Sequence, residues 1–154
     1  MKKYVKKGLL ILSLCIYFTC NTFAITTHEV KQNIIKQAKS MGVEPEIVLS
    51  IAKVESGFRQ NIKSSGGHVG VFQLSPATAK NMGYDPYKLD ENIKAGITYY
   101  KNMYNKFGSI ELAVAAYNSG PVAVSRNKNQ IPKKSRPFVS KIMRNYKHYK
   151  EQGL

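Results

Sequence analysis

The sequence predicts a compact, mainly α-helical domain with one small loop-rich insertion that holds a β-hairpin. Apolar residues recur at helical spacing along most of the 154 residues, and residues that cap or start helices precede these segments. One stretch, residues 61–74, breaks this pattern with closely spaced Gly and Ser. No internal repeat is present, so residues 25–154 are expected to form one domain large enough to bury a core.

The first segment, residues 1–24, has the form of a secretory signal peptide. Lysines precede an apolar run at residues 8–18, and Thr22 and Ala24 supply the small residues that precede a cleavage site. Two alternatives stay open. An uncleaved anchor helix would need roughly 20 apolar residues, and lipidation at Cys20 would follow residues bulkier than such a site usually has.

The positions of the cysteines and the net charge limit which reactive groups and which partners the domain can have. Cys15 and Cys20 both lie in the first segment, so a chain cleaved after Ala24 has no disulfide and no thiol nucleophile. The net charge is +15 for the whole sequence and +11 for residues 25–154. Such a field attracts polyanions, including wall polymers, lipid headgroups and nucleic acid, although a solubilising surface has the same composition.

We expect neither a metal nor another cofactor. Three scattered His and no Cys after residue 24 give no zinc-ligand spacing. The run at residues 64–67 lacks the Gly-Lys-Ser/Thr ending of a phosphate-binding loop.

Two helices are predicted before the insertion. The first begins at a capping box in residues 26–29 and runs through apolar residues to Gly42. The second begins at Pro45, a favourable first helical residue, and runs to about Ser56, where Gly57 ends it.

The insertion and a short helix follow. Residues 64–67 are expected to form a loop, and the apolar residues around Gly70 a short hairpin. Ser75 then caps a short helix that stops at Gly83.

Three more segments complete the predicted domain. Asp90 is expected to cap a long helix that closes near Gly108, and Ser109 to cap the next, which Gly120 ends. Basic and polar residues 125–136 are expected to form a surface loop. The last helix is predicted from about residue 137 to 150.

Glu55 is the candidate catalytic residue. It lies in the last turn of the second predicted helix, at the mouth of the insertion. The partial negative charge of a helix C-terminus and burial beside Val54 and Phe58 would both raise the pKa of its carboxyl. A Glu that is protonated near neutral pH can act as a general acid. The position alone also suits an ordinary solvated Glu.

Four motifs occur in a fixed order. They are Glu55-Ser56-Gly57-Phe58, then Gly70-Val71-Phe72-Gln73 with Pro76-Ala77-Thr78-Ala79, then Asn92-Ile93-Lys94-Ala95-Gly96, and Ala116-Tyr117-Asn118-Ser119-Gly120. Their order and spacing resemble the lysozyme-like lytic transglycosylase family (soluble lytic transglycosylase catalytic domain). The resemblance covers residues 29–145 and implies a lysozyme-like fold with a small β component.

The resemblance implies an enzyme that cuts peptidoglycan glycan strands. Glu55 would protonate the oxygen that links N-acetylmuramic acid to N-acetylglucosamine. The same carboxylate would then take the proton of the C6 hydroxyl, which closes on C1 and leaves a 1,6-anhydro end. Ordinary glycosidases need two carboxylates, and the other acids of this chain fall at expected helix ends, which suits a reaction with one.

The resemblance also implies a set of substrate-binding residues. Tyr117 would hydrogen-bond Glu55 and orient it, and Gln73 would contact the sugar together with the backbone of residues 70–72. Core packing is the alternative for the two tyrosines, and a helix-ending role for Ser56. The whole expected set is Ser56, Gly70, Phe72, Gln73, Tyr99, Tyr117 and Asn118.

The sequence departs from the family pattern in three places. Phe72 stands where the family usually has Met, and its ring could stack on a sugar. Lys134 and Phe138 replace a Glu and a Tyr of the family, which affects the expected substrate preference more than the chemistry. His68 stands where the family more often has Ala, and we interpret it as a loop residue.

These observations predict an exported lytic transglycosylase of the periplasm or cell envelope. By analogy, the small domain suggests a specialised enzyme that opens the wall for a secretion, conjugation or pilus apparatus. A lysozyme-type hydrolase and a non-catalytic wall-binding or assembly module are the alternatives. Nucleic acid is not an expected partner, because an export signal precedes the domain and no recognition motif is present.

Overall fold

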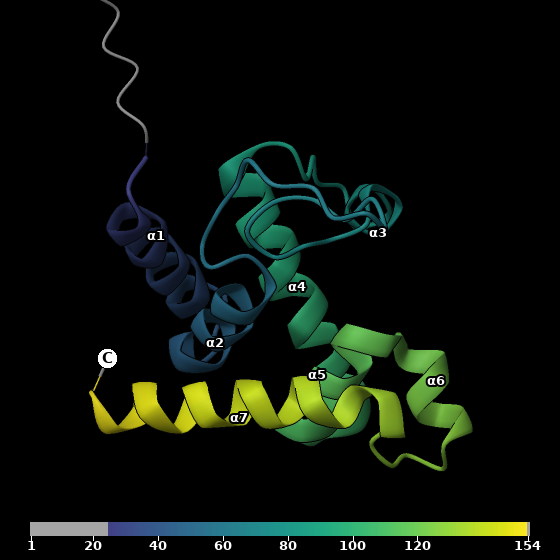
Figure 1. Cartoon of the computed structure of the whole chain (residues 1–154). Helices are drawn as coiled ribbons and strands as arrows, with labels where there is room; N and C mark the ends of the chain where they lie inside the picture. Colours follow the sequence, from purple (N-terminus) through teal and green to yellow (C-terminus); the bar gives the residue numbers. More distant parts are fainter. Residues whose placement is uncertain (1–24, 154) are drawn as a thin grey trace, which may run out of the picture.

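The computed structural model describes residues 25–153, and these are mainly helical (Figure 1). The signal-peptide prediction falls on residues 1–24, which lie outside the described residues. The mainly α fold predicted from the sequence is confirmed. The helices are α1 (Thr27–Ser40), α2 (Pro45–Glu55), α3 (Pro76–Asn81), α4 (Leu89–Phe107), α5 (Ile110–Ser119), α6 (Pro121–Arg126), the 3₁₀ turn η1 (Lys133–Ser135) and α7 (Arg136–Glu151).

Helix α2 is the central helix of the fold. Every residue from Pro45 to Ala52 is buried, a pattern typical of a helix that neighbours surround on all sides. Helices α1, α4 and α7 pack against it, and α7 runs alongside α2 and α5 in Figure 1. This packing holds Glu55, the last residue of α2, in a defined position.

The start of α1 follows the predicted capping box. The backbone amide of Glu29 donates to Thr26 Oγ1 at 3.2 Å, and the amide of Thr26 donates to Glu29 Oε2 at 2.7 Å. The predicted cap at Asp90 is wrong. Helix α4 begins at Leu89, and the Asp90 carboxylate in its first turn accepts a hydrogen bond from Asn33 at 2.6 Å.

The predicted hairpin is reduced to two isolated β-bridges, Lys63 with Val69 and Val69 with Leu74. Val69 and Leu74 exchange backbone hydrogen bonds of 3.0 and 3.2 Å, which close a tight turn over residues 70–73. The pairing stops there because Ser75 already caps α3 through the amide of Thr78. Within residues 25–153 no strand forms a sheet.

The predicted loop 125–136 is present at residues 127–132, and two short elements occupy its two ends. Helix α6 has Pro121 at its first position and buries Val124, and the 3₁₀ turn η1 buries Ser135 completely. Elements this short leave no helical period in the sequence, so the pattern could not reveal them. Helix α7 follows with the bounds expected to within one residue.

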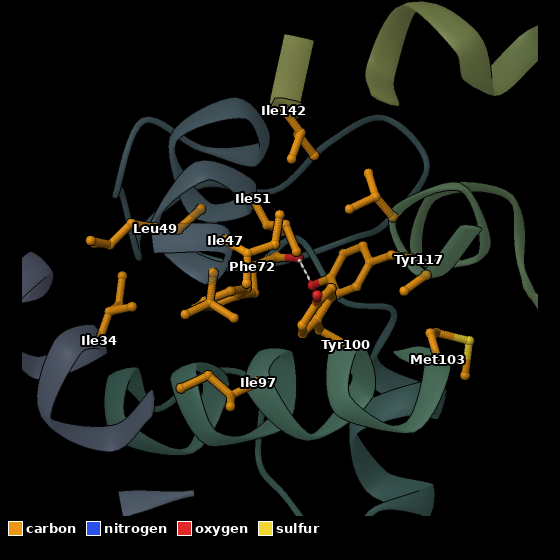
Figure 2. Packing of buried hydrophobic residues seen from close by; sticks show 14 of the residues in the cluster. Ile34, Ile47, Leu49, Ile51, Phe72, Ile97, Tyr100, Met103, Tyr117 and Ile142 are labelled. Carbon is orange, nitrogen blue, oxygen red and sulfur yellow. Dashed lines mark hydrogen bonds between the residues drawn. The ribbon is translucent and has the colours of Figure 1, made fainter. Parts of the chain in front are cut away.

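One apolar core joins these elements (Figure 2). Ile47 and Ile51 of α2, Ile97 of α4 and Ile142 of α7 are each 0–1% exposed and belong to the same buried cluster as Phe72, which is 0% exposed. The turn that carries Phe72 is therefore anchored in the centre of the domain. Between residues 25 and 153, no helix combines the length and apolar character that crossing a membrane requires.

Candidate active site

A cleft of about 470 Å³ opens at the C-terminal end of α2. The loop of residues 64–75, the start of α3, the middle of α4 and the end of α5 form its walls. Among the described residues that line it, one is acidic, Glu55, and one carries a basic side chain, His68. The lining residues are Glu55, Ser64, His68, Gln73, Leu74, Ser75, Thr78, Tyr99, Tyr117, Asn118 and Gly120.

The carboxyl of Glu55 is half-buried in this cleft. Burial raises its pKa from the ordinary value of 4.5 to about 7. Within residues 25–153 no cation or hydrogen-bond donor contacts this carboxylate, so nothing offsets the loss of water around the charged form. Near neutral pH, Glu55 can therefore give up a proton as an acid and accept one as a base.

Four polar side chains hold the turn of residues 70–73 beside Glu55. Ser56 Oγ donates to the carbonyl of Val71 at 2.7 Å, and the amide of Val71 donates to Gln60 Oε1 at 3.2 Å. The amide of Phe72 donates to Asn92 Oδ1 at 2.9 Å. Tyr117 Oη donates to the carbonyl of Phe72 at 2.8 Å, the dashed line in Figure 2.

These bonds explain why the four sequence motifs occur together. Ser56 follows Glu55 at the end of α2, Asn92 comes from α4 and Tyr117 from α5, and all three reach the same turn. The motifs thus build a scaffold that fixes the turn relative to Glu55. A network in which each buried polar group has a partner is rigid.

The structure corrects the expectation for Ser56 and Gly70. Ser56 is 2% exposed and bonded to Val71, so its side chain braces the turn and does not face the cleft. Gly70 is buried with φ +79°, and a Cβ there would lie 2.3 Å from Asn92 Nδ2. Its amide donates to Ile62 and its carbonyl accepts from Gln73. Throughout residues 70–72 the backbone groups are bonded within the protein.

The expectation that Phe72 stacks on a sugar is wrong. Its side chain is 0% exposed and lies against Gly96 of α4, where a Cβ would come within 2.1 Å of Phe72 Cγ. The ring fills space that only a glycine at position 96 leaves open. This contact accounts for the glycine of the Asn-Ile-x-x-Gly motif.

Tyr117 lies in the cleft wall, but the predicted hydrogen bond to Glu55 is absent. Its hydroxyl donates to Phe72 instead. Its ring meets that of Tyr99 edge-on, with 5.1 Å between ring centroids. Burial, followed by the charge of Glu55, raises the pKa of Tyr117 well above its usual range. Burial also raises the pKa of Tyr99, so both hydroxyls keep their protons.

The structure brings Gln73, Tyr99, Tyr117 and Asn118 into the cleft with Glu55. Gln73 lies at the end of the turn with φ +45°, and its side-chain amide donates to the carbonyl of Gly70 at 2.9 Å. Asn118 is exposed near the end of α5. Of the seven expected contacts, these four are the ones whose side chains face the cleft.

Several lining residues were not predicted from the sequence, including Ser64, Thr78 and Leu74, and His68 was expected only as a loop residue. Their places depend on how the insertion folds back over α2, which no periodicity encodes. Lys134 and Phe138, where the sequence departs from the family, do not line the cleft. Among residues 25–153 no cluster of His, Asp and Glu could hold a metal ion.

Residues 32–137 match the family described as "Transglycosylase SLT domain". A "Transglycosylase" of Enterobacteria phage PRD1 is 29% identical over 107 residues, 67% of this chain and 37% of that protein. "Membrane-bound lytic murein transglycosylase F" of Desulfosudis oleivorans is 31% identical over 93 residues, 55% of this chain and 20% of the relative. The chain therefore spans less than two fifths of the length of these relatives.

Solved structures share the fold. The 70 kDa soluble lytic transglycosylase of Escherichia coli superposes with a TM-score of 0.70 at 24% identity, over 78% of this chain and 24% of that one. The lytic transglycosylase Slt of Pseudomonas aeruginosa, solved as an inactive Glu-to-Gln mutant, gives 0.69 at 23% identity, over 79% and 24%. At these identities the likeness establishes the fold.

Proposed function

The chain belongs to the Transglycosylase SLT domain family, and from this premise we propose that it is a peptidoglycan lytic transglycosylase. It cleaves the β-1,4 bond between N-acetylmuramic acid and N-acetylglucosamine and leaves a 1,6-anhydro-muramic end. The observation that carries the proposal is Glu55, a half-buried carboxyl in the wall of an open cleft. Burial raises its pKa to about 7, and no other acid among the described residues lines this cleft.

In the first half of the reaction, protonated Glu55 donates its proton to the oxygen of the glycosidic bond. The bond between C1 of the muramic sugar and that oxygen breaks, and N-acetylglucosamine leaves with a new hydroxyl. Positive charge develops at C1, and the Glu55 carboxylate that remains stabilises it.

In the second half, the C6 hydroxyl of the muramic sugar attacks C1. Its proton passes to Glu55, which returns to its starting form, and the new C1–O bond closes the anhydro ring. The reaction consumes no water. A retaining or inverting hydrolase would need a second carboxylate about 5–10 Å away, and no other acid lines this cleft among the described residues.

Four side chains would contact the strand around this carboxyl. Tyr99 and Tyr117 keep their hydroxyl protons and present aromatic edges to a sugar, and Gln73 and Asn118 supply amide groups. In this proposal Ser56, Gly70 and Phe72 act indirectly, by fixing the turn that ends in Gln73.

The decisive experiment is mass spectrometry of soluble products from purified sacculi treated with the protein. We expect anhydro-muropeptides from the wild type and an activity about 10³-fold lower from Glu55→Gln. The matched control is Glu111→Gln, an exposed acid of α5 outside the cleft, which should cut normally. Wild-type activity in Glu55→Gln would refute the proposal.

The product end separates the two alternatives. A lysozyme-type hydrolase would leave reducing muramic acid. A wall-binding or assembly module would bind sacculi and release nothing. The second alternative is motivated by the basic surface and by the departures at Lys134 and Phe138, neither of which lines the cleft.

We also propose that residues 1–24 direct export and that the enzyme works in the periplasm or cell envelope. Relatives described as membrane-bound murein transglycosylases support this location. The amino-terminal sequence of protein recovered from the envelope tests it, with Ile25 expected as the first residue. Recovery of the full-length chain in the cytoplasm would contradict it.

The local role at a secretion, conjugation or pilus apparatus is a further proposal, by analogy with specialised enzymes of this kind. Cross-linking in the producing cell tests it. Recovery of apparatus subunits with the protein is the expected result, and a uniform distribution over the wall without such subunits would contradict it.

A further inference from the structure

The mechanism described above makes no use of His68, although its side chain lines the same cleft as Glu55. The imidazole is exposed. Among the described residues of the cleft wall no Lys or Arg is present, so His68 is the group there that can carry positive charge. His68 is therefore the basic side chain of this wall that an anionic part of a bound ligand could contact.

A closed turn fixes the backbone of His68. The amide of Ser64 donates to the carbonyl of His68 at 2.9 Å, and the amide of His68 donates to Ser64 Oγ at 3.1 Å. Inside the turn, Gly67 has φ +80° and its amide donates to the carbonyl of Ser64 at 2.9 Å. The turn therefore presents the side chain at a defined place and not on a free loop.

The ring is oriented as well. Its Nδ1 lies 3.5 Å from Ser64 Oγ, and Gly66 leaves room for it, since a Cβ at Gly66 would approach Nδ1 to 3.2 Å. Within residues 25–153 no hydrogen-bond partner contacts the other nitrogen, Nε2. This nitrogen is free to donate a hydrogen bond to a ligand, with or without positive charge on the ring.

The proposed substrate brings a matching group. The muramic sugar that reacts at C1 carries a peptide stem through a lactyl group at C3, and that peptide contains free carboxylates. A sugar positioned over Glu55 therefore carries its stem into or beside the cleft. A bond from an imidazole to a carboxylate is charge-assisted and about twice as strong as a neutral one.

We propose that His68 is a specificity-determining residue that binds a carboxylate of the peptide stem on the muramic sugar. This inference rests on the proposed function and adds a substrate preference to it. The enzyme would prefer glycan strands that keep their peptide stems to strands from which the stems have been removed. Among the described residues, the other titratable groups that line the cleft are Glu55, Tyr99 and Tyr117, and none of them can carry positive charge.

The test compares two substrates, glycan strands with intact stems and strands stripped of stems by an amidase. The readout is the ratio of kcat/KM on the first to kcat/KM on the second. We expect His68→Ala to lower this ratio about tenfold, because one charge-assisted hydrogen bond is lost. His68→Lys, which places an ammonium group at this position, is expected to recover part of the ratio.

Ser65→Ala is the matched control, because Ser65 is exposed in the same turn but does not line the cleft. It should keep the wild-type ratio. An unchanged ratio in His68→Ala would overturn the inference and leave the proposed function intact. Failure of the wild type to cut either substrate would count against the proposed function instead.

A binding measurement tests, without turnover, whether His68 contacts the peptide stem. Glu55→Gln protein labelled with nitrogen-15 is titrated with a disaccharide that carries a stem and with the same disaccharide without one. We expect the ring signals of His68 to shift with the first ligand and to stay in place with the second. Equal shifts, or none, would overturn the inference.

Discussion

The protonation state of Glu55 follows from one imbalance. Burial removes water from the carboxyl, and no described cation or hydrogen-bond donor takes its place, so the pKa rises to about 7. The sequence could suggest the direction of this shift from the helix end and the neighbouring apolar residues. The sequence could not show that the Glu55 carboxylate has no hydrogen-bond donor beside it, because this depends on Tyr117 donating to the carbonyl of Phe72 and not to Glu55.

A pH dependence of activity follows from this value. The reaction begins with protonated Glu55, so kcat/KM is expected to fall above pH 7, approaching tenfold for each further pH unit. Rates of anhydro-muropeptide release between pH 5 and 9 measure it. A rate that stays level from pH 6 to 9 would mean that another group supplies the proton.

The same group makes stability depend on pH. The folded-state pKa, about 7, lies above the ordinary value of 4.5, so the folded state keeps a proton that the unfolded chain loses. The stabilisation is complete below pH 4.5 and disappears as pH rises through 7. Urea unfolding measures the free energy of unfolding of Glu55→Gln relative to that of the wild type. This difference should shift in favour of Glu55→Gln by about 2 kcal/mol from pH 4.5 to pH 8, a figure reduced for solvent screening. A constant difference would contradict the raised pKa.

At the scale of elements, the site depends on how closely the turn of residues 70–73 packs on α4. Phe72 lies against Gly96, and Asn92 one turn earlier bonds the amide of Phe72. A single helix face thus fixes both the ring and the backbone of the turn. Any shift of Phe72 would move Gln73 and the edge of the cleft.

This contact predicts the effect of Gly96→Ala. The new Cβ would lie 2.1 Å from Phe72 Cγ, so the turn must move, at a cost of about 1–3 kcal/mol in the free energy of unfolding. Urea unfolding measures the loss, and turnover should fall with it. Adding Phe72→Leu, a smaller side chain, is expected to recover part of both.

The control for this prediction is Lys94→Ala, on the exposed face of α4. It should change the free energy of unfolding by less than about 0.5 kcal/mol. A stable and fully active Gly96→Ala protein would show that the turn does not depend on this packing. Equal losses in the single and double variants would locate the strain elsewhere.

The sequence predicted most elements because local chemistry specifies them. The capping box at Thr26, the cap at Ser109 and the glycine at 108 with φ +65° each act within one turn of the chain. The roles of Ser56 and Phe72 were misjudged because they depend on partners 15 and 24 residues away, Val71 and Gly96. Motif order located the site, and only packing distinguished the residues that face the cleft from those that support it.

At the scale of the whole molecule, charge is distributed unevenly. From residue 112 to 150 the sequence contains nine Lys and Arg and no Asp or Glu. Within residues 25–153 the ion pairs of this stretch involve only Lys147 and Lys150, at 4.0 and 3.6 Å. The outer face of α7 therefore presents Lys141, Arg144 and Lys147 to solvent.

This distribution predicts how the protein holds an anionic wall. Long-range attraction to exposed charges is screened over about 10 Å at 0.1 M salt, so binding to sacculi should weaken roughly fivefold or more between 0.05 and 0.5 M salt. Pelleting of the Glu55→Gln protein with sacculi separates this binding from cleavage. The triple variant with Glu at Lys141, Arg144 and Lys147 should bind weakly even at low salt.

The triple variant also separates attachment from chemistry. Its substitutions lie outside the cleft, so turnover of a short soluble glycan should stay near the wild-type rate while release from whole sacculi falls. A control with Glu at Lys36 and Lys39 of α1 and at Lys106 of α4, all exposed, changes the net charge by the same amount on other elements. If both variants lose the same amount of product release from whole sacculi, net charge is the cause. A larger loss in the α7 variant would indicate that α7 is the face that contacts the wall.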